Sequence, residues 1–407
     1  MEKNLNKEPT DRIAILLFSL WALALPWSLA AMQIALGLLA AYGAFTAIRR
    51  RRLRDYRHPF FILLGIYLLL QALSALFSAA PVRSLQAFLN TDWPAFTIPL
   101  LAAMTLSPAG RRKVAQILLF SASAVSVYAL FQFFLGIDIF RGTTLTAHGD
   151  FYRANGGYNF YLTFAGNQLM AFCLAFALLL FEKEPKRRAL YLLAAGLILA
   201  SVIATFGRST WIAAVLVLGL GTWLVNRRLF VISGAALIVV AVVLALAAPV
   251  FQERFLSIFD LAQNETRLNL WKTSATMIAG HPVWGIGPGM FTTMFPLYKV
   301  PGFYDTATHA HNDVLNMAVG SGLPGALAWL AVWGAWFYIA FRAFRRASPA
   351  AEDKALLFGS ILAIAGILIA GFFQCYYTDL ENNIFWWFMG VLGLQAAIRR
   401  GEKAVGD

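Results

Sequence analysis

The chain has 407 residues, of which 60% are hydrophobic and 13% charged, and its mean hydropathy is +0.67. Soluble globular proteins are roughly 45–50% apolar and about 25% charged, so this composition excludes a soluble protein; a disordered chain would be far less hydrophobic. The formal net charge of +13 would suggest a nucleic-acid partner only in a soluble protein. In a membrane protein the positions of the basic residues decide what the charge means.

Apolar stretches long enough to cross a membrane recur along the chain. A spanning helix needs about 20 apolar residues, because its backbone polar groups must be satisfied within the helix. We therefore expect an all-α polytopic membrane protein in which residues 1–407 form a single integral membrane domain. About twelve transmembrane helices are predicted, at 13–29, 31–48, 59–79, 88–106, 115–135, 160–181, 189–206, 211–225, 229–249, 314–341, 355–378 and 384–398.

The basic residues alternate between the two ends of these helices. If the N-terminus is cytoplasmic, 25 of the 33 Lys and Arg fall in cytoplasmic segments, with the densest run at 49–57. This is the positive-inside pattern, and it places both termini in the cytoplasm. The positive charge therefore orients the chain among membrane lipids, and we expect no nucleic-acid partner.

Two segments on the opposite side hold most of the polar chemistry. The smaller is 136–159, and the larger is 250–313, between the ninth and tenth predicted helices. No soluble domain is present, so any activity on a polar substrate is expected at this outer membrane face.

Two arginines stand out in this outer region. Arg208 follows the seventh predicted helix and precedes the eighth, which we expect to begin at Trp211. A guanidinium at the rim of the hydrocarbon is either functional or extends to lipid phosphate. Arg267 falls in the first turn of a predicted amphipathic surface helix with Leu268, Trp271, Ala275 and Ile278 at helical spacing. It is either an anion ligand near exposed amides or a solvated charge.

The end of the larger loop carries two histidines and a glycine-rich turn. His309 and His311 precede the tenth predicted helix, with Asn312 or Asp313 as its cap, which places His311 on the first turn. A neutral imidazole there can take a proton from a hydroxyl group; a metal ligand and a purely structural histidine are the other readings. The turn GIGPG at 285–289 could hold a phosphate with its amides, although such sequences more often form only a turn.

The outer face thus combines cationic Arg141, Arg153, Arg208 and Arg267 with a candidate base, and it contains no P-loop or GxSxG motif. The chemistry that fits is displacement of an anionic leaving group, with arginines stabilising the departing charge while His311 activates an incoming hydroxyl.

The order of motifs resembles the O-antigen ligase and polymerase superfamily over 190–345. The matching segments are GRSTW at 207–211, RLNLW at 267–271, HPVWGIGPGMF at 281–291, HAHNDVLN at 309–316 and GSGLPGALAW at 320–329. The segment from Arg153 is similar to the family's upstream periplasmic motif.

This resemblance implies a GT-C-like glycosyltransferase of the bacterial inner membrane with a periplasmic active site and no metal or other cofactor. The donor would be a glycan on undecaprenyl diphosphate. Arg208 and Arg267 would hold the diphosphate, with Arg153 as a further contact. His311 would be the catalytic base, with His309 and Asn312 in auxiliary roles.

The resemblance leaves several reactions open. The single large loop at 250–313, in the C-terminal half of the chain, favours a ligase. Such an enzyme transfers O-antigen to a lipid A-core hydroxyl during lipopolysaccharide biosynthesis. A polymerase or a protein O-oligosaccharyltransferase of the same superfamily is the alternative. From the residues alone, a transporter of the lipid-linked glycan, which would bind the same anion without chemistry, also stays possible.

Overall fold

The computed structural model describes residues 12–50, 59–104, 106–348 and 352–402. The predicted cytoplasmic termini and most of the basic run at 49–57 lie outside these ranges. The described chain is almost entirely helical, and its only strands are two short hairpins in the segment between α5 and α6. The helices are α1 Arg12–Ala24, α2 Leu29–Arg50, α3 Pro59–Leu76, α4 Pro81–Ala103, α5 Pro108–Leu135, α6 Tyr161–Phe181, α7 Pro185–Ala204, α8 Arg208–Val225, α9 Arg227–Ala247, α10 Pro249–Leu256, α11 Glu265–Gly280, α12 Phe291–Tyr298, α13 Asp313–Arg346, α14 Glu352–Gly371 and α15 Leu380–Glu402.

The hairpins pair antiparallel strands. In the first, Ile137 of β1 Ile137–Asp138 is opposite Thr144 of β2 Thr143–Thr144. In the second, Ala147 of β3 Ala147–His148 is opposite Tyr152 of β4 Phe151–Tyr152.

Each of the twelve predicted membrane segments coincides with one helix. Among the described residues, nine of these helices are long and apolar enough to cross a membrane, namely α2, α3, α5 to α9, α13 and α14. The polytopic, all-helical prediction is therefore confirmed. The number of twelve crossings and the GT-C-like arrangement stay predictions, since α1 has only 13 residues and α4 and α15 are not among the nine.

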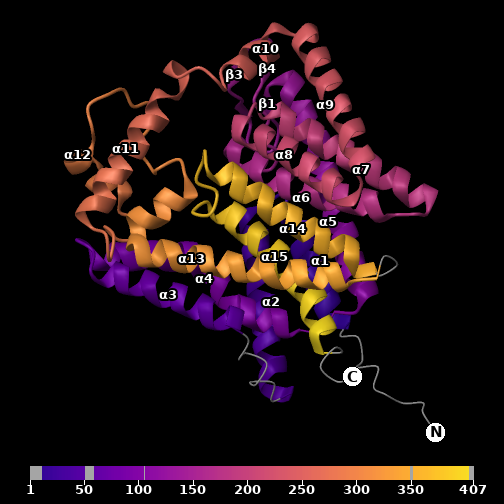
Figure 1. The fold of residues 1–407 in the computed structure, drawn as a ribbon, viewed down its shortest axis with the longest axis horizontal. Helices are drawn as coiled ribbons and strands as arrows, with labels where there is room; N and C mark the ends of the chain where they lie inside the picture. Colours follow the sequence, from indigo (N-terminus) through magenta and orange to yellow (C-terminus); the bar gives the residue numbers. More distant parts are fainter. Residues whose placement is uncertain (1–11, 51–58, 105, 349–351, 403–407) are drawn as a thin grey trace.

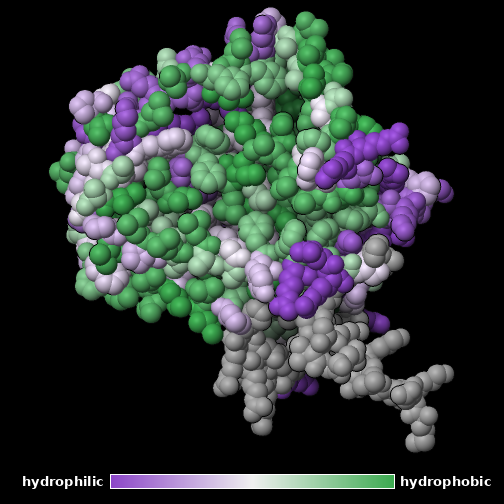
Figure 2. Space-filling model, viewed as in Figure 1, coloured by the Kyte–Doolittle hydropathy of each residue, from purple (hydrophilic) through white to green (hydrophobic). Residues whose placement is uncertain are grey.

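The helices differ sharply in how much of their surface the protein covers. In α6 every residue from Leu162 to Leu178 is buried, and α6 packs closely against α14 and α7. By contrast, none of the apolar window of α9 is buried, although its hydropathy is the highest of the nine spans. In water such a helix would expose a large continuous apolar surface, so α9 requires lipid around it. Figure 2 shows apolar side chains over most of the helical body.

Segments predicted to lie on one side of the membrane contact one another. The Tyr158 hydroxyl donates to the Leu25 carbonyl, and Ser84 Oγ donates to the Pro288 carbonyl at 2.9 Å. Six segments meet at one end of the helix bundle, which we call the loop end. They are 25–28, 77–80, 136–160, 205–207, 248–312 and 372–379. In Figure 1 the chain runs from α10 at the top to α11 and α12 at the left, then back into α13.

The opposite end is joined by charged contacts between α5 and its neighbours. Arg111 of α5 donates from Nε and Nη2 to the two carboxylate oxygens of Asp353 in α14, at 2.9 and 2.6 Å. Both side chains are almost completely buried, with 2% and 8% exposed. Arg112 forms a second ion pair with Glu182 at the end of α6. A bidentate pair of this kind fixes the relative positions of α5 and α14.

We predict that Asp353→Ala lowers the free energy of unfolding by about 3–5 kcal/mol, because it leaves the buried Arg111 charge without its carboxylate. The melting temperature of the purified protein in detergent measures the effect. Arg187→Ala is the control, since it removes an exposed pair with Glu184 at 3.8 Å, and pairs of this kind contribute little. Equal melting temperatures for the two variants would show that the buried pair stabilises the protein no more than the exposed pair does.

Candidate anion-binding and base site at the loop end

The turn between α7 and α8 positions Arg208. Thr205 Oγ1 donates to the Val202 carbonyl and accepts from the Gly207 amide, at 2.7 and 3.1 Å. Phe206 has a φ of +55°, a left-handed conformation that a bulky residue rarely adopts, and its ring is completely buried. The α8 helix then starts at Arg208, earlier than the predicted start at Trp211. Arg208 is therefore the first helical residue.

The short helix α10 adds a guanidinium that the sequence did not indicate. Arg254 donates from Nε to the Phe206 carbonyl at 3.0 Å. Arg208 in turn donates from Nη1 to the Ser257 carbonyl at 2.5 Å, just after α10. These two bonds join α10 to the α7–α8 turn, and each arginine bonds a carbonyl two or three residues away from the other arginine.

Two further arginines complete the group. Arg153, before α6, lies over the Tyr161 ring with its guanidinium carbon 4.6 Å from the ring centre. Arg267 is in the first turn of α11, as predicted, and donates to Asn264 Oδ1 at 3.3 Å. We call Arg153, Arg208, Arg254 and Arg267 the arginine cluster.

The arginine cluster is rich in positive charge that the protein does not neutralise. Within the described ranges, none of the four guanidinium groups lies within 4 Å of a carboxylate oxygen. Burial, followed by the charges of Arg153 and Arg208, lowers the pKa of Arg254 to about 10. Burial also lowers the pKa of Arg267. With a pKa of about 10, Arg254 is still charged at neutral pH. Nε of Arg153 and of Arg208 is buried and has no hydrogen-bond partner among the described residues. Such a group favours a bound anion with several oxygen acceptors.

The two histidines lie just before α13. Asn312, not Asp313, is the N-cap, and its side chain accepts from the Leu315 amide at 3.0 Å. His311 therefore precedes the cap. The prediction that it lies on the first turn of the helix was wrong. Its φ is +49°, a strained backbone conformation of the kind found at functional sites. The rings of His309 and His311 are 4.4 Å apart.

One side chain from the α14–α15 segment bonds both imidazoles. Oε1 of Gln374 accepts from Nδ1 of His311 and from Nε2 of His309, the latter at 3.3 Å. Nδ1 of His309 bonds the Thr308 hydroxyl at 2.8 Å. Nε2 of His311 is buried and has no partner within the described ranges. Burial, His309 and Arg267 lower the pKa of His311 to about 4. His311 is therefore neutral at pH 7 and has a free nitrogen that can accept a proton.

The structure thus brings together most of the predicted site residues. The charge of Arg267 acts on both Arg208 and His311, and Arg254 interacts with Arg153, Arg208 and Arg267. Anion-binding groups and a neutral imidazole therefore lie within electrostatic range of one another at the loop end. No group of three or more His, Cys, Asp or Glu side chains suited to a metal ion is found within the described ranges.

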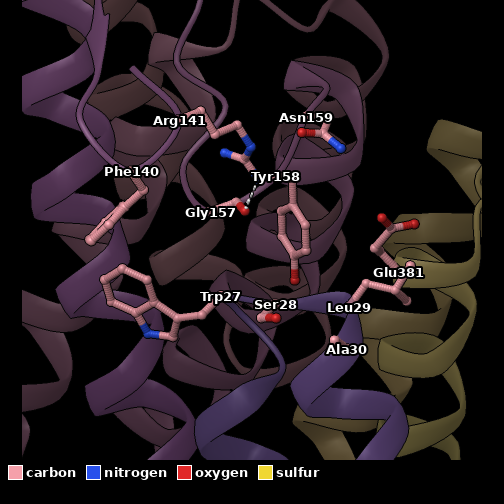
Figure 3. A pocket seen from close by; sticks show the side chains of 10 residues that line it. All are labelled: Trp27, Ser28, Leu29, Ala30, Phe140, Arg141, Gly157, Tyr158, Asn159 and Glu381. Atoms are coloured by element: carbon pink, nitrogen blue, oxygen red, sulfur yellow. Dashed lines mark hydrogen bonds between the residues drawn. The ribbon is translucent and has the colours of Figure 1, made fainter. Parts of the chain in front are cut away.

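Arg141 does not join the arginine cluster. It forms an ion pair with Asp138 at 2.7 Å and donates to the Gly157 carbonyl at 2.6 Å. It lines a separate open pocket of about 500 Å³ between the α1–α2 turn and the start of α15 (Figure 3). The other lining residues are Trp27, Ser28, Leu29, Ala30, Phe140, Gly157, Tyr158, Asn159 and Glu381.

The glycine-rich turn at 285–289 has a packing role. Its Ile286 and Gly287 amides donate to the carbonyls of Val319 and Gly320 in α13, both at 2.9 Å. Ser74 of α3 donates to the Gly320 carbonyl at 2.7 Å. These two amides are consequently not free to bind a phosphate. The turn instead holds α3 and the loop segment at the kink of α13, where Gly322 has a φ of +69°.

The predicted amphipathic helix is present as α11, but the protein buries a different face of it. Leu270 and Met277 are buried together with Asn269, Thr273 and Ser274, because the polar side chains bond the segment before His309. Asn269 donates to the Phe303 carbonyl at 3.1 Å, and Thr273 bonds the Tyr304 hydroxyl at 3.1 Å. The predicted apolar stripe is left exposed or only partly buried, and its placement along a membrane surface stays a prediction.

Part of the chain matches a known protein family. Residues 193–330 match the family model described as O-antigen ligase, so this region belongs to the O-antigen ligase superfamily of membrane ligases and polymerases. It contains Arg208, Arg254 and Arg267 together with both histidines. No curated protein matches the chain.

We predict that inorganic pyrophosphate binds the purified protein in detergent and that Arg208→Gln, Arg254→Gln and Arg267→Gln each weaken it about tenfold or more. The reason is the loss of a charge-assisted hydrogen bond, which contributes about 1.5–3 kcal/mol. Isothermal titration calorimetry gives the dissociation constants. Lys272→Gln is the control, because Lys272 is an exposed cation on the same helix as Arg267 and solvent screens its charge. Uniform weakening in all four variants would indicate only a non-specific effect of net charge.

Proposed function

We propose that this chain is an O-antigen ligase of the bacterial inner membrane, with its loop end in the periplasm and both termini in the cytoplasm. It transfers a glycan from undecaprenyl diphosphate to a hydroxyl of lipid A-core without a metal ion. The single observation that carries the proposal is the arginine cluster, which has no carboxylate partner among the described residues and lies near a neutral imidazole with a free nitrogen.

Each part of this site has a role in the proposed reaction. The arginine cluster binds the diphosphate and offsets the negative charge that develops as the glycosidic carbon–oxygen bond breaks. His311 takes the proton of the acceptor hydroxyl at Nε2. The acceptor oxygen forms the new bond to the anomeric carbon from the face opposite the diphosphate, so the configuration inverts. Undecaprenyl diphosphate leaves with the bonding electron pair.

The donor's two chemical parts match two surfaces of the protein. A diphosphate diester carries negative charge that fits the arginine cluster, and its long prenyl chain requires an apolar environment. Exposed apolar side chains cover the nearby helices, with α9 the extreme case. His311 is the better base of the two imidazoles, because both nitrogens of His309 are already hydrogen-bonded.

The test incubates purified protein in detergent with a lipid-linked glycan and excess chelator, with and without lipid A-core. Product that requires lipid A-core supports a ligase. Lengthened lipid-linked chains without it would indicate a polymerase, and glycan on Ser or Thr of an added protein would indicate an oligosaccharyltransferase. Binding without any product would indicate a transporter. In detergent there are no two compartments between which a substrate could be moved, whereas an enzyme would still form product. Loss of activity in chelator would contradict the metal-independent reaction.

We predict that His311→Ala lowers kcat for transfer by about 10²–10⁴-fold, the usual contribution of a general base. Arg208→Gln and Arg267→Gln should each lower it by about 10²-fold by loss of charge stabilisation. Initial rates with purified, detergent-soluble variants measure both effects. His281→Ala is the control, because that imidazole bonds the Tyr298 hydroxyl at 2.7 Å away from the arginine cluster. A wild-type rate for His311→Ala would remove the base assignment.

The pH dependence tests the same group. The pKa of His311 is lowered to about 4, so the imidazole becomes protonated and inactive only as the pH falls through that value. We predict that kcat/KM is constant from about pH 6 to 8 and declines below about pH 5, whereas an ordinary histidine would produce the decline near 6.5. Samples returned to neutral pH before assay control for unfolding. A midpoint near 6.5 would contradict a buried base.

A further inference from the structure

A second segment of the chain, outside the matched region, sets the protonation state of His311. Gln374 lies in segment 372–379 between α14 and α15, is 5% exposed, and is 63 residues away from His311 in the sequence. Its amide presents the oxygen, an acceptor only, to both imidazoles. A nitrogen that faces this oxygen must carry the hydrogen.

This constraint decides the tautomer of each ring. His311 donates from Nδ1–H, so its Nε2 has the lone pair, and this is the nitrogen for which the described part of the chain offers no partner. His309 donates from Nε2–H, so its Nδ1 accepts from the Thr308 hydroxyl. One amide oxygen therefore leaves only one of the four ring nitrogens free to take a proton.

The residues that follow His311 hold Gln374 in place. Asn312 Nδ2 donates to the Phe372 carbonyl at 3.1 Å. The buried Asp313 carboxylate accepts from the backbone amides of Tyr376 and Tyr377, at 3.2 and 3.0 Å. The run His311-Asn312-Asp313 thus binds segment 372–379 on both sides of Gln374. The same segment also contacts α8, since the Tyr376 hydroxyl bonds Ser209 Oγ at 2.9 Å.

We propose that Gln374 is a positioning residue that holds His311 in its Nδ1–H tautomer and directs Nε2 toward the acceptor hydroxyl. The catalytic consequence rests on the proposed function, whereas the tautomer does not. A neutral amide fits this role in a strongly cationic site. A carboxylate at this position would stabilise the protonated imidazole and raise its pKa, so the base would be lost at a higher pH than in the wild type.

The experiment compares Gln374→Leu and Gln374→Glu with the wild-type protein, labelled with ¹⁵N at histidine and purified in detergent. The chain has five histidines, so His311→Ala assigns the His311 signals. In the wild type we expect a pyrrole-type Nδ1 and a pyridine-type Nε2. Gln374→Leu should move the population toward the Nε2–H tautomer and lower kcat about 10²-fold, with KM for the donor little changed because the arginine cluster is intact.

The conservative variant provides a readout that a structural role would not produce. Gln374→Glu keeps an acceptor opposite Nδ1–H, so it should preserve the tautomer and raise the pKa of His311 by about one unit or more. The acid limb of kcat/KM should move up by the same amount. Gln395→Leu is the control, because it removes another buried glutamine side chain, one that donates to the Leu101 carbonyl at 2.8 Å, far along α15.

Three results would overturn the proposal, and a fourth would separate it from the proposed function. An Nε2–H tautomer of His311 in the wild type would overturn it, as would a wild-type tautomer and kcat in Gln374→Leu. Losses of kcat in Gln395→Leu as large as in Gln374→Leu would also contradict a specific role. If His311→Ala keeps full activity while the wild type shows Nδ1–H, the proposed function loses its base and the tautomer assignment is supported.

Discussion

The loop end depends on one electrostatic constraint, which is the gathering of four guanidinium groups that no carboxylate of the described chain neutralises by an ion pair. Like charges repel, and partial burial strengthens that repulsion because water no longer screens it fully. The depressed pKa of Arg254 reflects both effects. A protein region arranged in this way is stabilised by an anion, and a diphosphate supplies enough oxygen acceptors for several arginines at once.

The backbone holds these charges in place with rigid local features. Phe206, with its left-handed backbone and buried ring, ends the α7–α8 turn and offers its carbonyl to Arg254. His311 adopts a similar conformation directly before the cap of α13. Such conformations are unfavourable by about 1–3 kcal/mol each and persist only where the surroundings impose them. Among the described residues, these are the two non-glycine residues with positive φ. Phe206 lies directly before Arg208, and His311 carries the imidazole, so both strained positions belong to the candidate site.

The site is assembled from segments far apart in the sequence. Arg153 comes from the segment before α6, Arg208 from α8, Arg254 from α10 and Arg267 from α11. The imidazoles precede α13, and their common partner Gln374 follows α14. The matched region ends at residue 330, so it includes the imidazoles but not the amide that fixes their hydrogens. At the other end of the bundle, the buried pair of Arg111 with Asp353 connects α5 to the start of α14, the helix that leads to segment 372–379.

The sequence by itself determined the all-helical membrane architecture, because hydropathy over about 20 residues reflects the physics of the bilayer directly. It also indicated Arg153, Arg208, Arg267 and His311 as candidate site residues through their motifs. It did not indicate Arg254 or Gln374, which are single polar residues without any local pattern. It wrongly predicted that His311 lies on a helical turn. For the turn at 285–289 it left open whether the backbone amides bind a phosphate. Only the tertiary structure decided these points. Hydrogen bonds between distant segments occupy the Ile286 and Gly287 amides of the glycine turn, select the free nitrogen of His311 and bring α10 against the α7–α8 turn. Such pairings are set by packing rather than by spacing along the chain.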